Sequence, residues 1–261
     1  MIEHMPVTLD GCETFKWESE YAGYTYDIFV SKPVQSPPED GYPIIYVLDG
    51  RSYFHYAHDV IRLQSKNALK THIEPALIVG IGHSEADMRS RRFYDFTAPA
   101  DVYAYPDRLK GRTLGKHGGA ENFHRFIEDE LKPYIGETYR VDNKQQSLFG
   151  HSLGGYFALW AMLTKPASFH AYLACSPSIW WNDYELTRFA SRYIEAKTAA
   201  KLFLAAGERE GFMAEDAEKM AKTIAGCGTS CESYIAPEEN HASVVPAIIS
   251  RAFRFALSKK A

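Results

Sequence analysis

Short, almost continuous apolar runs recur along the chain and are separated by stretches with helical spacing. Residues 44–48, 76–82, 169–175 and 201–207 each form such a run, and each ends abruptly in polar residues or glycine. A run of this kind is typical of a parallel strand that is covered on both faces. Because helical stretches lie between the runs, the pattern predicts a mostly parallel sheet with helices on both faces.

Further strands are expected around these runs. Residues 25–30 alternate as in a strand near an edge, and a short strand is expected near residues 233–235. Another apolar run, residues 147–149, leads directly into GHSLG at residues 150–154 and then into a helix-favouring stretch to about residue 164. No repeat, low-complexity tract or linker interrupts this order, so residues 1–261 are expected to form one α/β domain around about eight strands.

Composition and charge exclude several classes of function. The 261 residues are 46% hydrophobic and 24% charged with a formal net charge of −4, so the basic surface of a nucleic-acid-binding protein is not expected. No stretch approaches the ~18 apolar residues of a membrane-spanning helix, and the first residues lack the pattern of a signal peptide. We therefore expect no nucleic-acid or membrane partner and a cytoplasmic location. The sequence carries no indication of oligomeric state.

The cysteines and histidines do not predict a metal site. Four cysteines are too few for a disulfide framework, and we expect structural thiols, with a bridge between Cys227 and Cys231 as the alternative. His55, His58 and Asp59 lie close together in the sequence, but no further ligands complete the geometry of a metal site. We expect neither a metal nor another cofactor.

The GHSLG motif is the first candidate for chemistry. It lies between a predicted strand and a predicted helix, where G-x-S-x-G forms a nucleophile elbow with small residues around a serine in a strained turn. Ser152 is therefore predicted to be a nucleophile. The competing interpretation is that a strand-to-helix turn simply requires a small residue here.

Candidates for a base and an acid follow further along the chain. A serine hydroxyl needs an imidazole to take its proton and a third group to orient that imidazole. His241, in the last strand-to-helix loop, fits the base, with an ordinary surface histidine as the alternative. Glu208 and Glu210 lie where the order Ser, acid, His of α/β hydrolases places the acid, and position alone leaves both open.

Backbone N–H groups are expected to form an oxyanion hole. One donor in this arrangement is the residue after the nucleophile, Leu153. The other comes from the loop after an early central strand, which here offers Gly50 or Arg51.

A long segment from Arg89 to Gly119 is expected to border the site. It is aromatic, basic and glycine-rich without clear periodicity, and a loop of this length is more often functional than idle. Arg92 in this segment could hold an anionic or aromatic substrate, with an ordinary surface charge as the alternative. Trp180 and Trp181 follow another predicted strand, and simple packing is the alternative for both.

Five ordered motifs together resemble a known family. They are YVLDG at residues 46–50, RFYDFT at 92–97, GGAENF at 118–123 with ELKPYI at 130–135, GHSLGG at 150–155 and SPSIWW at 176–181. The chain resembles the putative esterase (esterase D-like) family of α/β hydrolases, and in particular the siderophore esterases that open enterobactin-type or bacillibactin-type trilactones.

This resemblance implies an α/β-hydrolase fold and assigns roles residue by residue. It makes Ser152 the nucleophile and His241 the base, and it favours Glu210 as the acid through the turn Gly207-Glu208-Arg209-Glu210. Some members work with a Ser-His pair alone. The resemblance also suggests that Arg92, Trp180 and Trp181 face the acyl or catecholate part of a substrate.

The expected activity is cofactor-independent hydrolysis of a small-molecule carboxylic ester through an acyl-enzyme, with siderophore trilactones as candidate substrates. An acyltransferase or thioesterase using the same residues is the alternative enzyme. A binding protein with an inactive hydrolase site is the alternative from another class.

Overall fold

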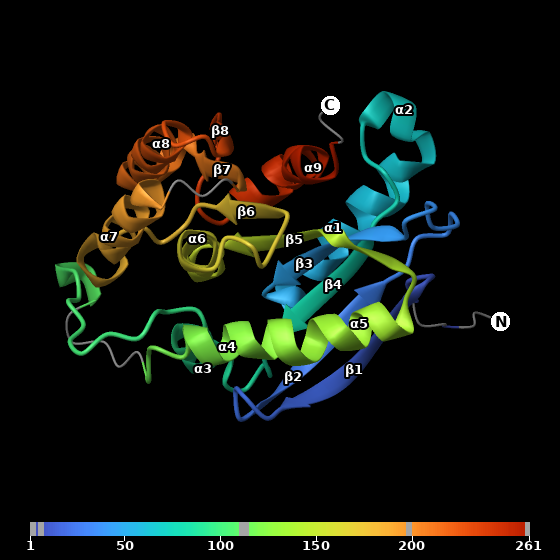
Figure 1. Ribbon diagram of the computed structural model, residues 1–261, viewed down its shortest axis with the longest axis horizontal. Coiled ribbons are helices and arrows are strands. Elements are labelled where there is room, and N and C mark those ends of the chain that lie inside the picture. Colours follow the sequence, from blue (N-terminus) through green and yellow to red (C-terminus); the bar gives the residue numbers. More distant parts are fainter. Residues whose placement is uncertain (1–3, 5–7, 110–114, 197–199, 259–261) are drawn as a thin grey trace.

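A single mixed sheet forms the centre of the computed structural model, which describes residue 4 and residues 8–109, 115–196 and 200–258 (Figure 1). Within these residues the sheet has eight strands in the order β1-β2-β4-β3-β5-β6-β7-β8. The pairs β1/β2 and β2/β4 are antiparallel and the other five are parallel. The strands are β1 (Cys12–Ser19), β2 (Tyr24–Ser31), β3 (Tyr42–Leu48), β4 (Leu77–Gly82), β5 (Val141–His151), β6 (Ala171–Cys175), β7 (Lys201–Gly207) and β8 (Ser230–Ala236).

Helices cover both faces of the sheet, as the sequence predicts (Figure 1). One face packs against α1 (Gly50–Gln64) and α9 (Val244–Leu257). The other packs against α4 (Ala120–Arg125), α5 (Lys132–Thr138), α6 (Leu153–Thr164), α7 (Trp181–Glu195) and α8 (Phe212–Ala225), with a π-helical segment Phe126–Leu131 joining α4 to α5. The remaining helical elements are α2 (Ala68–Thr71), α3 (Met88–Asp95) and the 3₁₀ turns Ser65–Asn67, Asp107–Leu109 and Glu208–Glu210.

The strands β3, β4 and β6 are buried along their whole length because both of their faces are covered. In β3, Ile45 and Val47 join the core beneath α1 and α9, whereas Tyr46 and Leu48 join the core on the opposite face. Successive side chains of a strand point to opposite faces, so an unbroken apolar run fills both cores at once.

The antiparallel edge was predicted only in part. The sequence pattern did not predict β1, because its polar residues alternate with Phe15 and Trp17 on a half-exposed edge. These two rings lie against Tyr134 of α5, with centroid separations of 5.3 and 5.0 Å. Aromatic contacts with a helix more than a hundred residues away hold this strand in place.

Two further features bear on the expectations from sequence. The segment from Arg89 to Gly119 was expected to be a loop, yet α3 occupies its first part, and residues 110–114 lie outside the described residues. No helix in the described part of the chain has the length and apolar character needed to cross a bilayer.

Candidate active site

The turn between β5 and α6 presents Ser152 in a strained conformation. Its backbone has φ 59° and ψ −116°, a region that residues other than glycine rarely adopt. A Cβ added at Gly150 would lie 2.1 Å from the Gly154 carbonyl oxygen, and one added at Gly155 would lie 2.8 Å from the Cys175 carbonyl oxygen. Gly150 and Gly155 are therefore required by close backbone approach around the serine.

Three of the predicted residues form one hydrogen-bonded chain. His241 Nε2 lies 3.0 Å from Ser152 Oγ, and His241 Nδ1 lies 2.7 Å from Glu210 Oε2. The serine follows β5, the glutamate follows β7 and the histidine follows β8, so the three side chains meet outside the carboxyl ends of parallel strands. This is the geometry in which an imidazole can take a proton from a hydroxyl while a carboxylate orients it.

Glu210 rather than Glu208 contacts the histidine. The other oxygen of Glu210, Oε1, accepts hydrogen bonds from Ser176 Oγ at 2.5 Å and from the Gly207 N–H at 2.6 Å. Burial raises the pKa of this carboxyl, but the hydrogen bonds from His241, Ser176 and Gly207 outweigh burial and leave the pKa lowered. Glu208 instead accepts a hydrogen bond from the Glu238 N–H at 2.9 Å.

His151, the variable position of the motif, lies against the histidine of this chain. The rings of His151 and His241 are 4.5 Å apart at an interplanar angle of 39°. Burial and the neighbouring His241 lower the pKa of His151 to about 4, and its Nδ1 lies 2.8 Å from the hydroxyl of Tyr53. Sequence reasoning missed His151, Tyr53 and Ser176, because no local pattern indicates which side chains meet at a strand end.

The predicted oxyanion-hole residues occupy the first turns of two neighbouring helices. Leu153 is the first residue of α6, and Gly50 and Arg51 are the first two residues of α1. Both helices begin where neighbouring parallel strands, β3 and β5, end. The first N–H groups of a helix have no acceptor within the helix and carry its positive dipole end, so this edge of the sheet is suited to a negatively charged oxygen.

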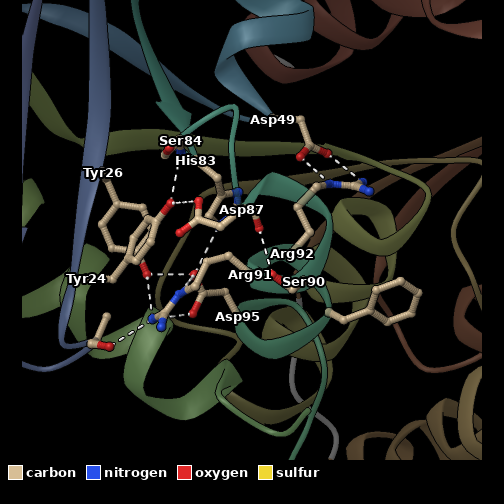
Figure 2. A network of polar contacts seen from close by, with 12 residues as sticks. Tyr24, Tyr26, Asp49, His83, Ser84, Asp87, Ser90, Arg91, Arg92 and Asp95 are labelled. Atoms are coloured by element: carbon tan, nitrogen blue, oxygen red, sulfur yellow. Dashed lines mark hydrogen bonds and ion pairs between the residues drawn. The ribbon is translucent and has the colours of Figure 1, made fainter. Parts of the chain in front are cut away.

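A cavity of about 240 Å³ surrounds the serine. Arg92 lines it, but its guanidinium is paired with Asp49 in a bidentate ion pair, with Nε–Oδ1 at 2.5 Å and Nη2–Oδ2 at 2.8 Å (Figure 2). The other lining residues are Asp49, Ser52, Tyr53, Met88, His151, Ser152 and His241.

The two tryptophans differ in position. Trp180 lines a second cavity of about 370 Å³ together with Tyr105, Tyr184 and Phe212. Trp181 is 1% exposed, and its ring packs among aromatic neighbours, so this structure puts it in the interior rather than on a cavity wall. Its neighbours are Phe93, Tyr103, Tyr105, His117 and Trp180.

The remaining polar candidates stand apart from this site. All four cysteines are free thiols, so Cys227 and Cys231 are not bridged. Among the described residues, no group of three or more His, Cys, Asp or Glu side chains could hold a metal ion. His58 contacts Ser31 Oγ at 2.8 Å and Cys12 Sγ at 3.3 Å, on the opposite side of α1 from the serine cavity.

Comparison with known proteins identifies the family. The model of the family described as "Putative esterase" matches residues 19–243. The chain belongs to this esterase family. Its activity is therefore that of a carboxylic-ester hydrolase, and its eight-stranded sheet with helices on both faces is the predicted α/β-hydrolase fold.

Named relatives of this esterase process siderophores. It is 41% identical to the ferri-bacillibactin esterase BesA of Bacillus subtilis over an alignment that covers 96% of this chain and 91% of BesA. The crystal structure of the BES protein from Bacillus cereus superposes with a TM-score of 0.91 at 37% identity, covering 98% of this chain and 99% of that one. The siderophore hydrolase EstA from Aspergillus nidulans gives 0.85 at 26% identity, covering 98% of each chain.

Proposed function

We propose that this esterase hydrolyses siderophore-type lactone esters through an acyl-enzyme formed on Ser152. The observation that carries the proposal is the hydrogen-bonded chain from Ser152 through His241 to Glu210. The ferri-bacillibactin esterase with which the chain is 41% identical indicates the substrate class. An acyltransferase or thioesterase on the same serine is not favoured, because the named relatives are esterases and hydrolases.

In the proposed mechanism, Ser152 Oγ attacks the ester carbonyl while His241 Nε2 takes the hydroxyl proton. Glu210 keeps the histidine oriented through Nδ1. The N–H of Leu153 and one from Gly50 or Arg51 hold the oxyanion, and loss of one such donor typically costs about 2.7–4 kcal/mol. His241 then gives its proton to the leaving alcohol, and water activated by the same imidazole releases the acid.

The aromatic cavity around Trp180 supports the proposal that the substrate carries an aryl group. Aromatic walls bind flat rings through offset or edge contacts. Tyr105, Tyr184 and Phe212 complete this wall, and Phe212 lies two residues after Glu210, close to the reacting centre along the chain. In this proposal Trp180 contacts the substrate, and Trp181 supports the wall from behind.

We also propose a cytoplasmic location, which the free thiols support. Four cysteines, including Cys12, Cys227 and Cys231 at intermediate exposure, are all unbridged. Unbridged cysteines are typical of reducing compartments. Cell fractionation with a compartment marker tests this location.

Replacement of Ser152 tests the reaction. Ser152→Ala should lower kcat on a p-nitrophenyl ester by about 10⁴-fold or more and abolish labelling by a fluorophosphonate, because the nucleophile is lost. Ser191→Ala is the matched control, since its hydroxyl bonds the Thr187 carbonyl within α7. Labelling of another residue, or wild-type activity in Ser152→Ala, would refute the mechanism.

An ester panel tests the substrate class. Short acyl esters, feruloyl esters and a ferric trilactone siderophore should be compared by kcat/KM, and the trilactone is expected to rank first. Addition of an alcohol or thiol acceptor should leave the free acid as the product. A marked preference for acetyl or feruloyl esters would count against the siderophore proposal while leaving the esterase intact.

A further inference from the structure

Asp49 joins β3 to α1 in an unusual way. Its backbone lies in the left-handed region, with φ 55° and ψ 46°, where residues other than glycine are uncommon. An aspartate in this N-terminal position commonly caps a helix by accepting an N–H on its carboxylate. The Asp49 carboxylate makes no such bond, although its backbone oxygen accepts from the Ser52 and Tyr53 N–H groups at 2.8 and 3.1 Å.

The carboxylate is instead bound to Arg92. The pair is bidentate, and the side chains of Asp49 and Arg92 are only 4% and 23% exposed. Burial lowers the pKa of the guanidinium, but the adjacent Asp49 outweighs burial and leaves that pKa raised. Bidentate pairs of this type fix geometry as well as charge, because two parallel hydrogen bonds define the relative orientation of two planar groups.

Arg92 stands on an anchored helix. The neighbouring Arg91 donates from Nε to Asp95 Oδ2 at 2.9 Å, and Asp95 is fully buried (Figure 2). The same Oδ2 accepts from the Tyr26 hydroxyl at 2.7 Å and lies 2.9 Å from His83 Nε2. These contacts tie α3 to β2 and to the residue after β4, so the Arg92 side chain starts from a fixed backbone.

The start of α1 is held from a second side as well. Arg51 Nε donates to Asp27 Oδ2 at 3.0 Å and to the His83 carbonyl oxygen at 2.9 Å. Asp49 Oδ2 also lies 3.5 Å from the position that a Cβ of Gly154 would occupy, next to the first turn of α6. The Asp49–Arg92 pair therefore lies beside both helix starts that the proposed oxyanion hole uses.

We propose that Arg92 is a positioning residue for the oxyanion hole and acts through Asp49. By drawing the carboxylate away from the first turn of α1, Arg92 keeps the N–H groups at the start of that helix uncapped by a side chain, and it stabilises the strained backbone that aims them. This role rests on the proposed acyl-enzyme mechanism. It differs from a substrate contact, because the Nε and Nη2 donors of the guanidinium are bonded to Asp49.

The two roles make opposite kinetic predictions. A residue that binds an anionic substrate changes KM for that substrate and leaves small neutral esters unaffected. A residue that positions the oxyanion donors lowers kcat for every ester, because the donors act in the transition state. p-Nitrophenyl acetate has no anionic group and separates the two cases.

The experiment compares Arg92→Met, Arg92→Lys and Asp49→Asn on p-nitrophenyl acetate. Arg92→Met should lower kcat by about 10²-fold, near the value for loss of one oxyanion donor, with KM changed less than threefold. Arg92→Lys should recover part of this loss, since lysine restores the charge but not the bidentate fork. Asp49→Asn should lower kcat, and the double variant with Arg92→Met should be no worse than Arg92→Met alone, because both changes remove one interaction.

A control variant and a fallback variant distinguish the possible outcomes of this experiment. Arg62→Met removes an exposed ion pair with Asp59 on the same helix α1 and should leave kcat unchanged. Should Arg92→Met fail to fold by circular dichroism, Asp49→Asn carries the test, because asparagine tolerates a left-handed backbone. An unchanged kcat with a raised KM for anionic esters overturns the inference, whereas an inactive, unlabelled wild type would overturn the proposed function instead.

Discussion

Two strand-to-helix turns lie side by side at the active edge of the sheet, and they are held in different ways. Ser152, after β5, and Asp49, after β3, both have positive φ, 59° and 55°, and neither caps its helix with its side chain. The serine turn is fixed by its own sequence, because Gly150 and Gly155 allow backbone contacts that any side chain would block. The aspartate turn is fixed by Arg92, 43 residues away in the chain.

This contrast shows that a strained functional backbone can be encoded locally or by a distant partner. Local encoding leaves a motif of glycines around one residue. Encoding by a distant partner leaves only an ordinary Asp-Gly pair and an arginine in a helix, which many proteins contain. The two turns should therefore respond differently to substitution.

The largest expected effect comes from replacing Glu210, the last residue of the hydrogen-bonded chain that begins at Ser152. Glu210→Gln should lower kcat by about 10³- to 10⁴-fold, because an amide cannot stabilise the imidazolium and favours the wrong tautomer. Steady-state kinetics on p-nitrophenyl acetate measure it, with Glu208→Gln as the control. A loss below tenfold would mean that Ser152 and His241 suffice for catalysis without Glu210. In that case, only the aspartate turn would depend on a side chain that is distant in the sequence.

The pH dependence of stability follows from the lowered pKa of Glu210. A carboxyl whose pKa is lower in the folded state contributes stability above its unfolded pKa, and that contribution is lost as pH falls through the folded pKa. Urea unfolding of Glu210→Gln should therefore lack this part of the acid-dependent loss seen in the wild type. If the unfolding free energies of the two proteins fell equally as the pH is lowered, the lowered pKa assigned to Glu210 would be contradicted.

A smaller effect is expected from adding a side-chain atom within the serine turn. Gly150→Ala should destabilise the protein by about 3 kcal/mol, because its Cβ would lie 2.1 Å from a backbone oxygen that cannot move aside. Gly136→Ala in α5 is the control, since its Cβ would meet Asn143 at an ordinary 3.6 Å and a helix favours alanine. Equal unfolding free energies for the two variants would remove the argument that the serine turn is fixed locally.

The smallest effect concerns His151 beside the serine. Because its pKa is lowered to about 4, the folded state loses stability as pH falls below the unfolded pKa near 6.5, by about 2 kcal/mol at pH 5. His124 has the same lowered pKa, also because of burial, but lies outside the site. His151→Gln and His124→Gln should both flatten the stability profile measured by urea unfolding, and only His151→Gln should change kcat.

The sequence by itself determined the central strands, the serine turn and the family. The boundaries of β7, residues 201–207, agree with the expected run, and α6 ends at Thr164 as expected. These features were readable because an unbroken apolar run records burial on both faces, and because GHSLGG records a backbone turn within six residues. The predictions of the strands and of the serine turn rest on residues that are close together in the sequence.

Only the tertiary structure decided which side chains meet. It joined Glu210, which the family resemblance already favoured over Glu208, to His241. It also buried Trp181, paired Arg92 with Asp49 and added β1 through contacts with α5. Such choices depend on strand order and on which helix covers which edge of the sheet, so residues distant in sequence become neighbours. A local sequence pattern shows whether a residue is polar or apolar, whereas the fold determines which other residue it contacts.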